Sequence, residues 1–289
     1  AYTPPEKDRL KKFVKTELTR AENKLGVLQE ELRQAENAED YKIFGDNLMT
    51  YAHLYEDHAD ASLTVDNIYS EAGEKITLKL DQRLTLSQNM QAFYHKYDKL
   101  KRAQKLLDGQ IALCEENIRY LSSVESSLSA SSTLPEIEEI KDELIQSGFL
   151  KESTKKKRQD KPSAPFRFET EDGKSILVGK NNYQNDRLTF HTAAPDDIWL
   201  HAKDIPGSHV ILRLSGEEPS EESLHHAALL AAHFSKAQDS SNVPVDYTYR
   251  RYVKKPSGSR PGFVIFTHQK TLYVTPSAED AARLLLEER

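Results

Sequence analysis

The chain has 289 residues, of which 37% are hydrophobic and 30% are charged, with a formal net charge of −6. Globular proteins are typically about 45–50% apolar and about 25% charged, so this chain has less core and more surface than its length suggests. No run of about 18 apolar residues is present, so we expect no membrane insertion. Part of the molecule is expected to be elongated.

Cysteine usage and the start of the chain are also informative. A single cysteine, Cys114, can form neither an intrachain disulfide nor a cysteine-based zinc site, which fits a reducing compartment. The chain begins at Ala1 without a methionine and without the apolar stretch of a signal peptide. We therefore expect the C-terminal part of a longer, cytoplasmic protein.

Charge divides the chain into parts. Residues 1–150 carry 19 Lys and Arg against 27 Asp and Glu, whereas residues 151–289 carry 21 against 19. Residues 151–163 are polar, basic and flanked by proline, which predicts a linker. A helical part over 1–150 and a folded domain over 164–289 are expected on either side.

Apolar residues of the first half follow alternating steps of three and four, the spacing of a coiled-coil seam. Two such seams flank an insert, and the most economical arrangement pairs them as a long antiparallel coiled-coil hairpin. The first seam contains Leu10, Val14, Leu18, Ala21, Leu25, Leu28, Leu32 and Ala35, and the second contains Phe93, Tyr97, Leu100, Gln104, Leu107, Ile111, Cys114, Ile118, Leu121 and Leu128.

The insert, over about residues 39–88, is predicted to be a small cap. It begins with the amphipathic segment DYKIFGDNLMTYAHLY and continues as two alternating runs that flank a turn at Gly73, the pattern of a β-hairpin. After the second seam, the segment from Leu134 to Phe149 predicts a short helix with Gly148 as its C-terminal cap.

The second half changes to the period of β-strands. Helices are expected only from about Ser220 to Gln238 and from about Ser277, so this half is predicted to be a compact α+β domain with a mainly antiparallel sheet. The expected strands are Phe166–Phe168, Ser175–Val178, Leu188–His191, Ile198–His201, His209–Leu214, Val245–Val253, Phe263–Thr267 and Thr271–Val274.

One cluster lies in the segment DIWLHAKDIPGSHV. A strand would place Trp199 and His201 on one face and Ile198 and Leu200 on the other. An indole beside histidines, a lysine and a hydroxyl could stack on a nucleobase and bind phosphate. We name Trp199, His201, Lys203, Ser208 and His209 as candidate RNA contacts. The alternative is that the indole is core and the histidines make structural hydrogen bonds.

The residues of this cluster support catalysis or metal binding less well than RNA contact. Ser208 and His209 are adjacent on a strand and point to opposite faces, so they do not form a nucleophile–base pair, and no catalytic residue is assigned. The histidines of this half have no recognisable ligand spacing, so neither a metal nor another cofactor is expected. The histidines considered were His201, His209, His225, His226 and His233.

A second cluster is basic and rich in amides. Lys and Arg neutralise phosphates, whereas Asn, Gln and Tyr donate to phosphate and ribose oxygens. The candidate RNA contacts here are Lys180, Asn181, Asn182, Asn185, Arg251, Lys254, Lys255 and Lys270. The alternative is a solvated strand edge that carries lysines to prevent edge pairing.

The linker contains the densest positive charge of the chain, at Lys155, Lys156, Lys157 and Arg158. This run could contact a phosphate backbone or be a solvated tether.

Four ordered motifs are similar to the R domain of the NFACT family, whose bacterial members are RqcH-type ribosome quality-control factors that are also described as fibronectin-binding proteins. They are VGKNNYQNDRLTF, DIWLHAKDIPGSHVIL, VPVDYTYRRYVKKPSGSRPGFVIF and QKTLYVTP. The first half resembles the family's middle coiled-coil region, in GDNLMTYAHLY and LSQNMQAFYHKYDKLKRA.

The resemblance implies a function in translation. It implies binding to large ribosomal subunits (rRNA) that carry stalled peptidyl-tRNA, and recruitment of alanyl-tRNA for C-terminal alanine tailing. The family's tRNA-selecting motif lies in an N-terminal domain outside this chain, so tailing by this part alone is not expected. The alternative is an adhesin fragment that binds host fibronectin at a Gram-positive cell surface, reached by a non-classical route. The oligomeric state is left open.

Overall fold

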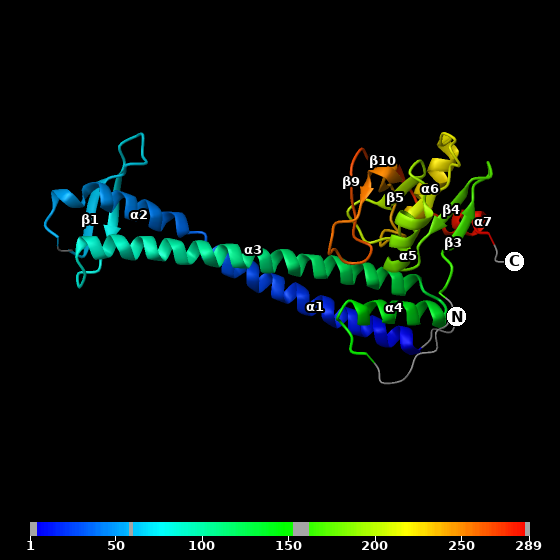
Figure 1. The fold of residues 1–289 in the computed structure, drawn as a ribbon, viewed down its shortest axis with the longest axis horizontal. Coiled ribbons are helices and arrows are strands. Elements are labelled where there is room, and N and C mark those ends of the chain that lie inside the picture. Colours follow the sequence, from blue (N-terminus) through cyan, green and yellow to red (C-terminus); the bar gives the residue numbers. More distant parts are fainter. Residues whose placement is uncertain (1–4, 58–59, 153–161, 287–289) are drawn as a thin grey trace. The chain divides into compact units, whose positions relative to one another are not determined.

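The computed structural model describes residues 5–57, 60–152 and 162–286 (Figure 1). The chain divides into two units, one formed by residues up to 20 together with those from 117 onward, and the other by residues 21–116. Helices α1 (Pro5–Gln34) and α3 (Leu86–Ala130) contribute to both units. Within the described ranges, no helix is long and apolar enough to cross a membrane.

In the unit of residues 21–116, α1 and α3 run antiparallel. The Cys114 thiol donates to the carbonyl oxygen of Ala21 over 3.1 Å, and the Gln104 amide donates to the carbonyl oxygen of Ala35. Leu28 and Leu107 are buried in the seam. The expected antiparallel pairing of the two seams is confirmed within this unit.

The insert folds as the expected helix and hairpin. Helix α2 (Ala38–Tyr51) and the short helix η1 (Ala52–Leu54) precede strands β1 (Ser62–Asp66) and β2 (Lys75–Lys79), which pair antiparallel. Leu48, Leu78 and Leu86 form the buried centre of this cap. Gly73 has a φ of 72° in the connecting turn, a conformation that glycine adopts without strain.

In the other unit, the start of α1 and the end of α3 pack with helix α4 (Leu134–Gln146). Val14, Val124, Leu128 and Ile140 are fully or almost fully buried between these three helices. Thr133 and Glu136 form a capping box at the start of α4, and Gly148, with a φ of 82°, follows its C-cap. We refer to these three helical segments as the helical base.

The rest of this unit contains a six-stranded antiparallel sheet within the described residues, in the order β10-β7-β5-β6-β4-β3. Helix α6 (Glu221–His233) covers one face, and its alanines pack on Val178, Leu200 and Val245. Helix α7 (Ala278–Leu284) packs against the same core. The strands are β3 (Phe166–Glu169), β4 (Ser175–Val178), β5 (Ile198–Ala202), β6 (Val210–Leu212), β7 (Val243–Tyr249) and β10 (Lys270–Val274).

The opposite face of the sheet is also buried. Leu177, Trp199 and Ile211 lie side by side across β4, β6 and β5 and are covered by Leu188 and Val253. The covering segments are α5 (Asn182–Arg187), the π-helical turn η2 (Leu188–Thr192), the 3₁₀ turn η3 (Arg250–Tyr252), and strands β8 (Val253–Lys254) and β9 (Ile265–Phe266). A sheet buried on both faces therefore forms the core of this domain.

Four of the expected strands were wrong or too long. Leu188–His191 is helical rather than extended, because Asn181 caps α5 and the helix continues into η2. Val245–Val253 is interrupted by η3, and the strands expected at His209–Leu214 and Phe263–Thr267 shorten to β6 and β9. Most of the expected linker, including its basic run, lies outside the described residues.

Substitution of Gly179, which follows β4, tests how tightly this segment packs against Asn185. A Cβ at this position would lie 2.9 Å from Cγ of Asn185 and 3.0 Å from its backbone nitrogen. We expect Gly179→Ala to lower the free energy of unfolding by about 1–3 kcal/mol, measured by urea denaturation. Gly26→Ala is the control, because a Cβ there meets nothing within 4 Å and should raise helix stability by about 0.5–1 kcal/mol. Equal effects of the two substitutions would contradict the packing described.

Candidate nucleic-acid interface

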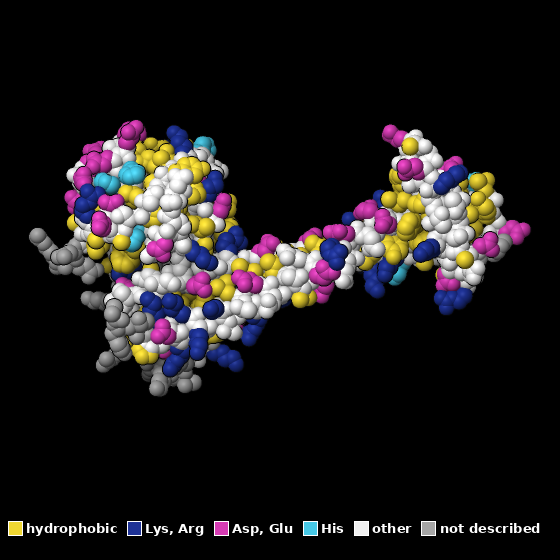
Figure 2. Space-filling model, turned by 180° about the vertical axis from the view of Figure 1, so that it is seen from behind, with side chains coloured by type: hydrophobic (Ala, Val, Ile, Leu, Met, Phe, Trp, Pro, Cys, Tyr) yellow, Lys and Arg dark blue, Asp and Glu magenta, His cyan; other side chains and the backbone are white. Residues whose placement is uncertain are grey.

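A groove of about 1140 Å³ lies between the helical base and the sheet domain, within one unit of the chain. Its basic lining residues are Arg9, Lys11, Lys12, Lys15, Lys180 and Lys236, against the acidic Asp8, Glu125 and Asp239. Lys and Arg side chains also gather on the surface of the helices in this unit (Figure 2). The groove therefore has an excess of positive charge, although the whole chain is acidic.

The helix α1 supplies most of this charge. Leu10, Val14 and Leu18 are buried in the helical base, so the residues between them turn outward. Lys11, Lys12 and Lys15 are exposed and line the groove. These lysines were not predicted as contacts, although the helical spacing in RLKKFVK places them away from the seam residues.

The other walls of the groove provide hydroxyl groups and backbone. Ser122, Ser126 and Ser129 of α3 face it, and on the sheet domain Gly207 and Ser208 line it. Such hydroxyls can donate to phosphate or ribose oxygens. The combination of lysines, serines and the backbone at Gly207 is chemically suited to a sugar-phosphate backbone.

The side chains of the motif Lys180-Asn181-Asn182 contact other parts of the protein. The Lys180 ammonium pairs with Glu136 at 3.0 Å, and Asn181 donates to Glu139 at 3.1 Å while its own oxygen caps α5. The Lys180 and Glu136 side chains are only 13% and 7% exposed. These side chains attach the sheet domain to α4, so the expected RNA contact by Asn181 and Asn182 is not supported by their placement.

Glu143 of α4 is the centre of this attachment. Its carboxylate accepts from the backbone N–H and the side-chain amide of Asn182, at 3.0 and 3.2 Å, and from the hydroxyl of Tyr120 at 2.7 Å. The side chain is 1% exposed, and this burial raises the pKa of Glu143 although the hydrogen bonds from Tyr120 and Asn182 oppose the shift. One buried acceptor thus joins α3, α4 and α5.

Arg260 adds a second attachment between the helical base and the sheet domain. Its guanidinium donates to the side-chain oxygen of Asn117 at 2.5 Å and to the carbonyl oxygen of Ser147 at 3.4 Å. It also lies over the rings of Tyr120 and Phe149, with centroid distances of 5.3 and 4.9 Å. These cation–π contacts hold the segment before β9 against the helices.

Trp199 and His209 are buried, which fits the alternative in which the indole is core and the histidines make structural hydrogen bonds. Trp199 is 1% exposed and packs against Phe266 and His209 at centroid distances of 4.7 and 5.4 Å. His209 bonds Thr189 at 2.8 Å and the carbonyl oxygen of Gly262 at 3.0 Å. The indole therefore cannot stack on a nucleobase in this conformation.

The other members of this cluster differ in accessibility. His201 stacks on Trp199 with a centroid distance of 5.8 Å, which confirms that the two share a face of β5. Its ring nitrogens face the carbonyl oxygens of Ala202 and Gly207. Lys203 is exposed at the end of β5, and Asn185 is buried, where its oxygen accepts from the N–H of His209.

Some residues of the expected basic patch make contacts within the protein, whereas others are exposed. Lys255 donates to the carbonyl oxygens of Arg260 and Phe263 and pairs with Asp186 at 3.3 Å, so it stabilises the loop before β9. Arg251 pairs with Asp196 at 2.7 Å and remains partly exposed. The exposed lysines of the patch are Lys254 and Lys270.

Comparison with known protein families shows to which family the chain belongs. Residues 4–163 match the NFACT N-terminal and middle domains, and residues 164–267 match the NFACT protein RNA binding domain. The chain belongs to the NFACT family. The groove described above is thus lined by both NFACT segments, with α1 and α3 from the first and Gly207 and Ser208 from the second.

Relatives of this NFACT chain include two bacterial proteins named Rqc2 homolog RqcH. The one from Bacillus subtilis is 42% identical over 95% of this chain, and the one from Streptococcus suis is 44% identical over 93%. In each case the match covers 48% of the relative, so the chain spans about half the length of the curated relatives it matches.

A solved structure has a similar fold. It is the C-terminal part of the fibronectin/fibrinogen-binding protein from Streptococcus suis, with a TM-score of 0.76 and 37% identity. The similarity covers 97% of this chain and 98% of that one.

Substitution of Glu143 tests the attachment of the sheet domain. Glu143→Gln would place an NH₂ group against the donors of Asn182, and we expect it to lower the free energy of unfolding by about 1–3 kcal/mol. Hydrogen exchange at the amide of Asn182 should accelerate in the same variant. Glu138→Gln, a partly exposed position on the same helix, is the control and should change little. Unchanged exchange in Glu143→Gln would contradict the role of this carboxylate.

The buried His209 predicts a pH dependence. Burial lowers the pKa of His209 to about 3, so the unfolded chain, with an ordinary value near 6.5, binds a proton that the folded protein excludes. The stability contribution is complete above pH 6.5 and is lost as the pH falls, by about 2 kcal/mol at pH 5. The free energy of unfolding, measured by urea denaturation, should decrease less between pH 7 and pH 5 in His209→Gln than in the control His191→Gln. An equal decrease in the two variants would contradict the prediction.

Proposed function

We propose that this chain is the RNA- and ribosome-binding part of an RqcH-type ribosome quality-control factor, and that it contacts ribosomal RNA of the large subunit through the groove. The observation that carries the proposal is the excess of basic side chains in that groove. Phosphate neutralisation needs several cations within reach of one backbone, which Lys11, Lys12 and Lys15 supply from neighbouring positions of α1. The names of the relatives and of the RNA-binding domain support the same assignment.

The proposal includes the finer steps of quality control. The chain would hold the factor on a large subunit that carries stalled peptidyl-tRNA, and alanyl-tRNA would be recruited for C-terminal alanine tailing by parts of the protein beyond this half. Such a factor acts in the cytoplasm, where ribosomes are found.

We also propose that the chain binds rather than catalyses. The ring nitrogens of His209 are engaged with Thr189 and Gly262, so neither is free to activate the Ser208 hydroxyl. This geometry supports the expectation that Ser208 lines a binding surface.

A second candidate function is binding of fibronectin. It is favoured by one observation, the similarity to a streptococcal protein whose name states that it binds fibronectin and fibrinogen. This function would require display at the cell surface, and it gives no role to the basic groove.

The test is binding of the chain to purified large ribosomal subunits over about 50–200 mM salt. We expect Lys11→Glu/Lys12→Glu/Lys15→Glu to weaken binding at least about tenfold, because repulsion replaces three phosphate contacts. The slope of log affinity against log salt should flatten by about three units.

The control makes the same change in charge outside the groove. Lys24→Glu/Lys99→Glu/Lys105→Glu alters three exposed lysines of the unit 21–116 and should retain most of the affinity. An equal loss in both variants would overturn the assignment to the groove. Absence of binding by the unmodified chain would overturn the proposed function.

Two further measurements separate the alternatives. Lys254→Glu/Lys270→Glu tests the exposed part of the basic patch, and a larger loss there than in the α1 variant would move the contact to that surface. Binding to immobilised fibronectin, measured in parallel, would favour the second candidate if it occurs without binding to ribosomal subunits.

A further inference from the structure

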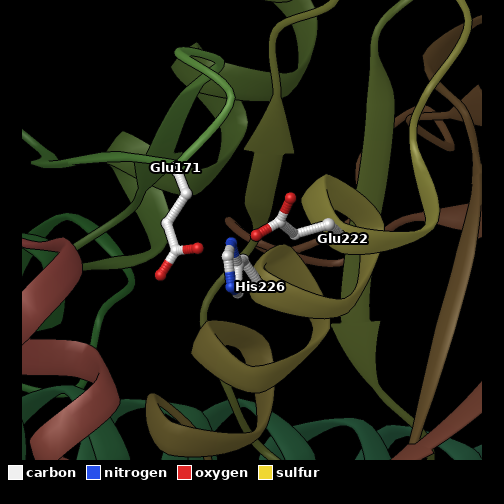
Figure 3. A group of neighbouring side chains, drawn as sticks. All are labelled: Glu171, Glu222 and His226. Carbon is white, nitrogen blue, oxygen red and sulfur yellow. The ribbon is translucent and has the colours of Figure 1, made fainter.

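Three side chains outside the groove come together at the start of α6. Glu222 and His226 lie on this helix, and Glu171 lies in the turn between β3 and β4. Each offers an oxygen or nitrogen atom that lies within 4.8 Å of the others. Figure 3 shows both carboxylates directed toward the edge of the imidazole.

The local structure holds these groups in place. The Ser220 side chain caps α6, so Glu222 falls in the first turn and His226 one turn later, on the same face. The Ser220 hydroxyl also donates to Asp172 at 2.9 Å, which ties the turn that carries Glu171 to the start of the helix. The three groups are thus positioned by a helix cap and a turn that are joined to each other.

The environment of His226 points to a missing bonding partner. The residue is 6% exposed, and its Nδ1 atom is buried with no hydrogen-bond partner among the described residues. A buried polar atom without a partner is costly, and buried imidazole nitrogens are normally satisfied, as those of His209 are. The neighbouring His225 is exposed and has no such requirement.

The proximity of the two carboxylates is a second feature that indicates a missing bonding partner. The ligand atoms of Glu171 and Glu222 lie within 4.8 Å of each other, and two like charges at this separation repel unless a proton or a cation lies between them. Arg283 pairs with one oxygen of Glu171 at 2.8 Å, whereas Glu222 has no ion pair among the described residues. The pairing with Arg283 orients the Glu171 carboxylate.

We propose that Glu171, Glu222 and His226 form a binding site for a divalent transition-metal ion of the zinc class, with water completing the coordination. Nitrogen and carboxylate oxygen ligands at about 2.0–2.2 Å from the ion are characteristic of zinc. In a tetrahedral site of this size the ligand atoms lie about 3.3–3.6 Å apart, so the exposed glutamates need only move closer to the imidazole. The bound ion would connect the β3–β4 turn to α6 and so stabilise the sheet domain.

The site is tested by isothermal titration of the untagged, metal-free chain with ZnSO₄, together with thermal unfolding. We expect one zinc ion to bind per chain at this site and to raise the unfolding temperature of the unmodified protein. Glu222→Gln removes an exposed ligand with little risk to folding and should weaken this binding at least tenfold. His226→Gln should also weaken it.

Two neighbouring substitutions serve as controls. Glu221→Gln and His225→Gln alter exposed groups on the same turns of α6 and should leave zinc affinity unchanged. Absence of zinc binding by the unmodified chain, or full retention of binding in Glu222→Gln, would overturn the proposal. Equal weakening by Glu221→Gln and Glu222→Gln would mean only general attraction to acidic residues and would also overturn it.

Discussion

The buried carboxylate of Glu143 is the constraint on which the larger unit depends. It lies almost fully out of water and is surrounded by donors from Tyr120 and Asn182. A carboxylate in such a place is tolerated only while those donors remain, so the sheet domain must stay docked on the helical base. The flanking pair Lys180–Glu136 and the guanidinium of Arg260 act in the same direction. The groove is a consequence of this docking.

This attachment changes the interpretation of the NFACT motifs in the chain. Residues that are chemically suited to RNA, such as Asn181 and Asn182, are used to join two parts of the protein. Glycines support the same packing: Gly262 donates to Asp186, accepts from His209 and leaves no space for a side chain beside Asn182. The surface left for a polyanion is then formed by lysines of α1, a helix that belongs to the coiled-coil half of the sequence.

Much of the fold could be predicted because it depends on local patterns. The three-and-four spacing around Leu28 and Leu107, the alternation in β5 and the turn at Gly73 each specify an element from neighbouring residues. Predictions were wrong where tertiary contacts compete with these patterns. The apolar run at Leu188 has the composition of a strand, yet the cap provided by Asn181 makes it helical. The zinc-class site was not expected because Glu171 is distant in sequence from Glu222 and His226.

The sequence by itself determined the antiparallel seams, the α+β class and the resemblance to the NFACT family, because periodicity and motif order are local properties of the chain. Only the tertiary structure decided which polar residues face solvent. Burial depends on what packs against a side chain from elsewhere: Trp199 is enclosed by Phe266 and Lys180 by Glu136, whereas Lys11, Lys12 and Lys15 remain open to the groove. For this reason composition could name candidate residues for RNA contact, while packing decided which of them are exposed.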